Sequence, residues 1–327
     1  MGSLKLVNSA TDCGSNATPW RRKIAEIPPN HLKSRAAYVL LNCSANMANQ
    51  TTLARSVSAS GIGLHTGVEV NLTLKPAPEN TGYVFVRTDL DNFEIPASVE
   101  FISHCSYATT LMRRGVVLST CEHLLSALRG NWIDNCFIEL DSIEVPILDG
   151  SSENFIDLLE KAGTVEQDSP RRTLVVKKKV EVDQNGRKMS IEPAENFEID
   201  CVIDFPHPFI KRQKYHFVMK NGSFGREIAS ARTFGFAEEI DMLRKANLAL
   251  GGSLDNAIVL TKDGMLNETP LRFADEFVRH KILDIIGDAA LVGMPVKGRI
   301  TAEKSGHSVH AQLMTKLLED ESAWEIV

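Results

Sequence analysis

The sequence predicts an α+β fold made of two domains. Its 327 residues exceed the roughly 250 to 300 residues at which a single hydrophobic core stops growing. Strand-like runs precede helical segments twice along the chain, which is typical of two α+β units rather than of a βαβ repeat. The segment Asp275–Leu291 is apolar on two sides, as expected of a helix buried between layers. The expected domains are residues 51–170 and 171–327, after a flexible extension over residues 1–50.

Composition narrows the class of protein. With 43% hydrophobic and 24% charged residues, the chain is typical of a globular protein and unlike collagen or a disordered chain. The net charge of -6 argues against a nucleic-acid partner held by a basic field. The uncharged apolar runs are far shorter than the about 18 residues of a membrane span, so no stable membrane insertion is expected. The six cysteines have no C-x-x-C spacing, which favours free thiols in a reducing compartment. We expect a monomer.

The first 46 residues allow more than one interpretation. They are rich in Ser, Asn and Ala and more basic than acidic. A disordered extension without a function fits this composition. An organelle transit peptide, for example a mitochondrial one, fits it as well, and a bacterial chain would instead be cytoplasmic.

The first domain is expected to alternate short strands with two helices. Val68–Leu74 has its apolar residues at every second position, which predicts a strand with one buried face. A helix is expected from the Ser-x-x-Glu sequence at Ser119 to Gly130. A polar linker over Gln167–Arg172 closes the unit. Its remaining elements are expected as strands at 83–87, 116–118 and 135–140 and a helix at 153–162.

The second domain shows the same sequence of strands and helices. Phe197–Phe205 alternates most clearly between apolar and polar residues. The helix Asp275–Leu291 carries His280, Asp284 and Asp288 on its polar positions. Because buried charges are costly without compensation, these side chains need partners. The other elements are expected as strands at 173–182, 188–191, 257–260 and 297–303 and helices at 238–246 and from about 308.

Two short motifs offer metal ligands. His280 and Asp284 stand four residues apart, which places imidazole and carboxylate on one helical face. Taken alone, such a pair is more often a simple buried His–Asp hydrogen bond than a set of metal ligands. Glu122 and His123 form a second cluster at the start of another helix, where a capping box between Ser119 and Glu122 is the alternative.

Together, His123, His280 and Asp284 supply three N/O ligands and leave a fourth position for water. This is the layout of a catalytic zinc site, and Glu122 is placed to act as a carboxylate base. The pattern H-E-x-x-H is absent, so a zincin-type protease is excluded.

Two further residues are candidates for the same chemistry. His307 follows an expected strand and precedes a helix, so it could donate a proton over the site, or it could be an ordinary surface histidine. Thr233 lies between Arg232 and Phe234; its hydroxyl could support an oxyanion, or it could simply pack.

Nine segments, in order from about residue 53 to the C-terminus, resemble the family of the UDP-3-O-acyl-N-acetylglucosamine deacetylases, the zinc amidases that commit lipid A synthesis. They are Gly61–Gly67, Lys75–Pro78, Arg87–Leu90, Ser119–Leu125, Pro146–Ser151, Ala231–Phe236, Leu250–Ser253, Asp275–Asp288 and Lys304–His307. The resemblance implies two domains whose sheets enclose the helices. It implies hydrolysis of the N-acetyl group of UDP-3-O-(3-hydroxyacyl)-N-acetylglucosamine with Zn²⁺ as cofactor, although iron could replace zinc.

The resemblance also implies residue roles. The zinc ligands would be His123, His280 and Asp284. Glu122 would be the general base, His307 the general acid oriented by Asp288, and Thr233 the group that steadies the oxyanion. The nucleotide and sugar would contact His65, Phe205, Lys281 and Lys304, and an apolar passage in the second domain would take the acyl chain along Phe234, Phe236, Met242, Leu243 and Leu248–Leu250.

The chain departs from the family pattern at two places. Pro206 stands where Asn or Asp is usual, which puts one nucleotide contact in doubt because Pro lacks an N–H and a polar side chain. Met47 lies where the family's bacterial chains usually begin, so the preceding residues are either a targeting extension or a misassigned start. Two rivals remain: a catalytically silent homologue that binds lipid or nucleotide sugar, and a zinc hydrolase for a different N-acyl substrate.

Overall fold

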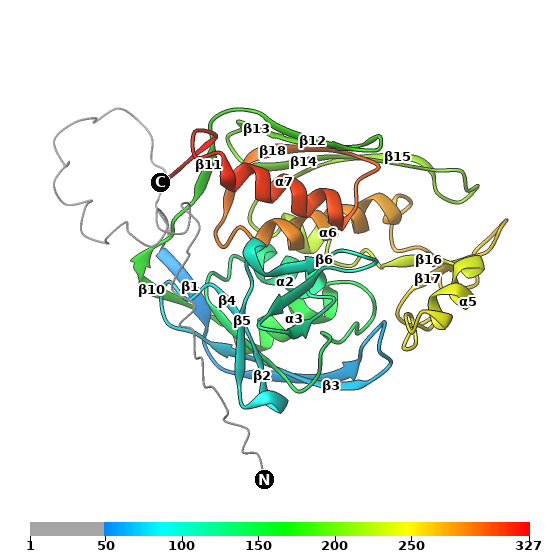
Figure 1. Ribbon diagram of the computed structural model, residues 1–327, viewed down its shortest axis with the longest axis horizontal. Helices are drawn as coiled ribbons and strands as arrows, with labels where there is room; N and C mark the ends of the chain where they lie inside the picture. Colours follow the sequence, from blue (N-terminus) through cyan, green and yellow to red (C-terminus); the bar gives the residue numbers. More distant parts are fainter. Residues whose placement is uncertain (1–48) are drawn as a thin grey trace, which may run out of the picture. The chain divides into compact units, whose positions relative to one another are not determined.

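The computed structural model describes residues 49–327, and the expectations for residues 1–48 lie outside this range. Asn49 and Gln50, expected in the flexible extension, belong to strand β1 (Asn49–Leu53). The first part of the described chain builds a five-stranded sheet in the order β2-β3-β9-β4-β5 (Figure 1). Its strands are antiparallel except for the parallel pair of β4 and β9. On β3, Val70, Leu72 and Leu74 point into the core at every second position, as expected. The strands are β2 (Val57–Ile62), β3 (Glu69–Pro76), β4 (Tyr83–Arg87), β5 (Phe93–Pro96) and β9 (Cys136–Leu140).

Smaller elements complete this part. Helix α3 packs on β2 and on α2. A three-stranded sheet of β6, β7 and β8 leads into α2. The bounds are β6 (Ile102–His104), β7 (Thr110–Arg113), β8 (Val116–Leu118), α2 (Glu122–Gly130) and α3 (Glu153–Ala162), with 3₁₀ turns at Thr88–Leu90 and Val99–Phe101.

The second part builds a seven-stranded sheet around β18. Strand β18 runs parallel to β11 and β14 and antiparallel to β13. The run expected as one strand at 173–182 is two strands, β11 and β12, separated by residues 177–179. The first pairs with β18 and β19, and the second pairs with β13. The bounds are β11 (Leu174–Val176), β12 (Val180–Gln184), β13 (Arg187–Glu192), β14 (Phe197–Phe205), β15 (Lys211–Val218), β18 (Val296–Glu303), β19 (Trp324–Ile326), α6 (Glu276–Ala290) and α7 (His307–Glu319).

The prediction of a polar linker over Gln167–Arg172 is wrong in part. Residues 167–170 belong to β10 (Thr164–Pro170), which pairs antiparallel with β1 (Asn49–Leu53). Polar side chains at these positions are compatible with a two-stranded ribbon that has one solvent-facing side. The domain boundary near residue 170 stays a prediction.

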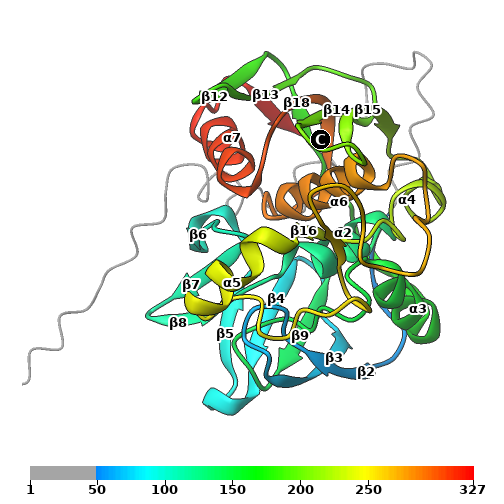
Figure 2. The same ribbon diagram turned by 90° about the vertical axis from the view of Figure 1, so that its right-hand side faces the viewer.

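Helices α2 and α6 form the layer between the two large sheets, as expected for an α+β fold with sandwiched helices (Figures 1 and 2). They pack directly on each other. A Cβ atom at Gly287 would lie 2.0 Å from the backbone oxygen of Glu122, so only glycine allows this approach. The contact brings the start of α2 against the middle of α6, where the candidate metal ligands lie.

The segment between β15 and α6 contains α4 (Ser223–Glu227), β16 (Phe234–Phe236), α5 (Ala237–Lys245) and β17 (Ile258–Leu260). Strands β16 and β17 pair in parallel, and α5 lies next to them (Figure 1). Across residues 49–327, no helix has both the length and the apolar character needed to cross a bilayer. The four cysteines in this range are free thiols, as expected.

Candidate active site and metal centre

Three buried side chains from α2 and α6 converge. His280 Nε2 lies 3.4 Å and His123 Nε2 lies 3.8 Å from Oδ1 of Asp284. The three donor atoms lie within 4.8 Å of one another, and each residue is at most 4% exposed. Ligands about 2.0 Å from a tetrahedral ion are roughly 3.3 Å apart, so the spacing suits one shared cation.

The hydrogen bonds of this cluster leave the donor atoms available. His280 Nδ1 lies 3.0 Å from the carbonyl oxygen of Ala231, and a proton on Nδ1 frees the lone pair of Nε2. Within the described chain, Oδ1 of Asp284 is buried and accepts no hydrogen bond. Burial and the neighbouring His280 lower the pKa of His123 to about 3, and burial also lowers the pKa of His280. Neutral imidazoles and an ionised carboxylate fit a divalent cation.

Lys281 keeps Asp284 charged. Its Nζ lies 2.9 Å from Oδ2 of Asp284. Burial opposes ionisation of this carboxyl, but Lys281 and the nearby histidines hold its pKa below the usual range. Asp284 in turn raises the pKa of Lys281 against the effect of burial. One carboxylate oxygen is thus used by the lysine, and the other faces the histidines.

Glu122 stands beside the three ligands and is 2% exposed. Its Oε2 accepts a hydrogen bond from the Thr109 N–H at 3.1 Å. Burial raises its pKa to about 7, against the opposing charge of His307. The capping-box interpretation is wrong: no side chain caps α2, and the Ser119 hydroxyl instead bonds that of Thr110 at 2.9 Å. A buried carboxylate that titrates near neutrality suits a general base.

Asp288 binds two histidines of α7. Its Oδ2 lies 2.7 Å from Nδ1 of both His307 and His310, and its Oδ1 accepts from the Thr109 hydroxyl at 2.6 Å. These distances are those of hydrogen bonds rather than of ligands on one ion. Burial alone would lower the pKa of His307, but Asp288 and Glu122 outweigh it and raise the pKa to about 10. His307 is 10% exposed, so the surface interpretation is wrong.

The protonated face of His307 points at the site. Its Nε2 lies 3.7 Å from Oε1 of Glu122 and 4.0 Å from Oδ2 of Asp284. A cationic donor and a buried base therefore flank the same three ligands. This pairing of acid and base with separated pKa values is typical of hydrolytic sites.

Replacing Asp288 with Asn is expected to lower the pKa of His307, because it removes the largest charge that raises this pKa. A group with a raised pKa keeps its proton until the pH passes that value, so the high-pH fall of kcat/KM should move to lower pH. Rates measured from neutral to alkaline pH check this. The same alkaline limb in Asp288→Asn and native protein would show that His307 does not depend on Asp288.

Glu144 is a further carboxylate near the site that the sequence analysis did not identify. Glu144 is fully buried. It accepts hydrogen bonds from the backbone N–H groups of His65 and Thr66, from the Thr66 hydroxyl and from the Thr120 hydroxyl, all between 2.7 and 2.9 Å. Thr120 has a φ of +57° and stands two residues before Glu122. Glu144 thus ties the His65 loop to the segment that presents the base and a metal ligand.

Several of the residues expected to bind the substrate, together with Thr233, line one cavity. A cavity of about 380 Å³ is lined by His65, Thr233, Phe234 and Phe236, and also by apolar residues of α5 and β17 such as Leu243 and Val259. The backbone of Thr233 is fixed by hydrogen bonds to Gly150 and Ile258. Of the other expected passage residues, Met242 and Leu250 are about half exposed and do not line the cavity.

Phe205 and Lys281 join this cavity through Phe234. The ring of Phe205 lies 5.8 Å from that of Phe234 and 5.9 Å from that of Phe236. Lys281 Nζ lies 5.4 Å from the Phe234 ring. Lys304 is exposed, and its Nζ lies 3.1 Å from Oδ2 of Asp204, next to Phe205. Phe205 and Lys281 are thus close to the cavity lining, whereas Lys304 lies at the surface.

Comparison with known proteins identifies the family of this chain. Residues 50–319 match the family model described as "UDP-3-O-acyl N-acetylglycosamine deacetylase". Proteins named UDP-3-O-acyl-N-acetylglucosamine deacetylase from Myxococcus xanthus, Hahella chejuensis and Solibacter usitatus are similar over most of their length. The first is 49% identical over 280 residues (85% of this chain, 89% of the relative), the second 47% over 284 (86% and 94%) and the third 46% over 281 (86% and 95%). The chain therefore belongs to the UDP-3-O-acyl-N-acetylglucosamine deacetylase family.

Proposed function

We propose that this chain hydrolyses the N-acetyl group of a UDP-3-O-acyl-N-acetylglucosamine, giving acetate and the free amine for lipid A biosynthesis, with one Zn²⁺ held by His123, His280 and Asp284. The observation that supports it best is the convergence of two imidazole nitrogens and one carboxylate oxygen within 4.8 Å. Glu122 and His307 lie beside that cluster, and their pKa values, raised to about 7 and about 10, suit a base and an acid respectively.

A bound divalent cation supplies Lewis acidity to the acetyl carbonyl and makes a neighbouring water easier to deprotonate. Glu122 takes a proton from the water that adds to the acetyl carbon. The carboxylate is suited to this step because its pKa lies near neutrality. The Thr109 N–H fixes one of its oxygens, which orients the other.

His307 delivers the proton that the leaving nitrogen needs when the carbon–nitrogen bond breaks. Its Nδ1 proton is held by Asp288, so Nε2 carries the proton that is given to the amine. Thr233 offers its hydroxyl to the oxygen that becomes negative at the acetyl carbon. Lys281 holds Asp284 in position and keeps it ionised.

The remaining groups select the substrate. The apolar cavity beside Phe234 takes the acyl chain, since alkyl groups leave water for such a surface. His65, Phe205 and Lys304 contact the sugar and the uridine diphosphate, where Lys304 meets phosphate as a point charge. Pro206 is exposed after β14, so its missing N–H removes a nucleotide contact without disturbing the core. The bacterial relatives support a cytoplasmic enzyme.

Acetate release from UDP-3-O-(3-hydroxymyristoyl)-N-acetylglucosamine tests the proposal. The native protein should release acetate, a chelator should abolish the reaction, and Zn²⁺ added back should restore it. Iron(II) added back in a parallel sample identifies the preferred metal. Binding of the substrate without any acetate release would instead support a silent binding module. Release from other N-acyl sugars only would contradict the assigned substrate.

A further inference from the structure

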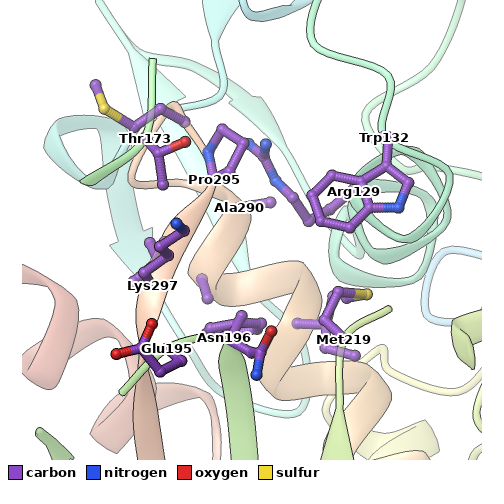
Figure 3. A pocket seen from close by; sticks show the side chains of 14 residues that line it. Arg129, Trp132, Thr173, Glu195, Asn196, Met219, Ala290, Pro295 and Lys297 are labelled. Carbon is purple, nitrogen blue, oxygen red and sulfur yellow. The ribbon is translucent and has the colours of Figure 1, made fainter. Parts of the chain in front are cut away.

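A second cavity lies at the opposite ends of the two site helices. It measures about 120 Å³ and is lined by Arg129 in the last turn of α2 and by Ile286 and Ala290 near the end of α6 (Figure 3). The metal donors lie at the start of α2 and near the middle of α6. Most of its wall is apolar: Phe197, Met219, Ile286, Ala289, Ala290, Met294, Pro295 and Val296. An apolar cavity of about 150 Å³ can hold benzene, so this space suits a body of similar size.

Arg129 brings an uncompensated charge to this cavity. It is 8% exposed, and its Nε is buried without a hydrogen-bond partner. Within residues 49–327, no carboxylate forms an ion pair with it, and its guanidinium lies 5.4 Å above the ring of Tyr83. A contact with an aromatic face offsets only part of the cost of burying a cation. The guanidinium therefore has capacity for an anion.

Trp132 adds an aromatic side chain to the wall of the same cavity. The indole Nε1 of Trp132 is buried and lacks an acceptor among the described residues, and Trp132 lines the same cavity. In Figure 3 the side chain of Arg129 runs from beside the Trp132 ring toward Pro295, and the indole nitrogen lies on the side of its ring away from the guanidinium. Because Nε of Arg129 and Nε1 of Trp132 are covered by protein atoms, the rest of the Arg129 guanidinium is the group that a bound anion would meet.

The nearby carboxylates do not supply the acceptor. Asp134 borders a neighbouring space of about 40 Å³ together with Arg129. Its oxygens already accept from Arg171 Nε at 2.9 and 3.0 Å and from the Thr51 N–H at 2.8 Å. Glu195 lines the same 120 Å³ cavity as Arg129 but is exposed. Lys297, half buried, adds a second cation to the lining.

We propose that this cavity binds a small organic carboxylate with a compact apolar body, such as an aromatic ring. The carboxylate pairs with the Arg129 guanidinium, Lys297 adds long-range attraction, and the apolar body contacts the Trp132 ring. The apolar body lies against Ile286 and the other apolar residues of the wall. The site is separate from the metal centre and takes no part in deacetylation.

Nitrogen-15 labelling of the tryptophans gives a local readout, because the indole N–H signal of Trp132 moves when an aromatic ring binds against this side chain. The signal is assigned by its absence from Trp132→Phe. Benzoate added at millimolar concentrations to the metal-loaded protein should displace it saturably. The neutral isostere benzamide should not. Benzoate bound at the metal centre alone would leave this signal in place and contradict the proposal.

Arg129→Met should weaken benzoate binding by about tenfold or more, since it removes a charged hydrogen-bond donor. Its deacetylation rate should stay native, which also shows that it folds. If that variant does not fold, Lys297→Met gives the second test, and it should weaken benzoate by a few-fold. Unchanged affinity in Lys297→Met, or a response to inorganic phosphate as strong as that to benzoate, would overturn the assigned ligand.

Discussion

Replacing Glu122 with Gln is expected to lower kcat by about 10²- to 10⁴-fold, the usual range for loss of a general base. The amide keeps an oxygen that can accept from Thr109 but cannot take a proton from water. Glu122 is not among the three clustered ligands, so the metal content should stay native. Single-turnover rates and elemental analysis on the same preparation measure both quantities.

Glu160→Gln is the matched control, because it makes the same chemical change at an exposed position of α3. It should keep the native kcat. A Glu122→Gln variant that turns over like the control would remove Glu122 from the mechanism. A variant that loses both activity and metal would show that Glu122 acts through the metal centre and not as a base.

Replacing Glu144 with Ala is expected to have the largest effect on stability. It leaves four hydrogen-bond donors from two loops without their shared acceptor. Such bonds to a charged group are worth about 1.5 to 3 kcal/mol each, and water entering the space replaces some of them. We therefore expect the free energy of unfolding to fall by about 3 kcal/mol or more, measured by urea denaturation.

The same variant tests whether the network positions the site. Because Glu144 holds His65, a residue of the cavity lining, KM for the nucleotide substrate should rise more than kcat falls. Glu144→Gln keeps one acceptor oxygen and should recover part of both properties. Native stability and native KM in Glu144→Ala would show that the His65 loop does not need this carboxylate.

Local patterns in the sequence predict much of this fold. The strands expected at 83–87, 116–118 and 197–205 have those bounds in the structure, because alternation and turn residues act over a few positions. The helix expected at 275–291 spans Glu276–Ala290. The pairing of strands is not local. Residues 167–170 have the composition of a linker, but they form a strand because they pair with β1, more than a hundred residues earlier in the chain.

The same limit applies to the candidate site: the sequence predicts neighbours on one helix but not contacts between distant segments. His280 and Asp284 could be paired from their spacing on one helix. The approach of His123 could not, since it depends on the close contact of α2 with Gly287. Thr109 reaches Asp288 across 179 residues, and no local pattern indicates this. His310 could have been noticed, because a histidine three residues after His307 lies on the same helical face.

Metal stoichiometry tests the central claim most directly. After incubation with Zn²⁺ and desalting, elemental analysis should find one zinc per native chain. His280→Ala and Asp284→Ala should lose it, because each removes one of three converging donors. His310→Ala, which changes the neighbouring hydrogen-bonded cluster, should keep it. A native chain that holds no metal, or one whose zinc survives both ligand substitutions, would contradict the account.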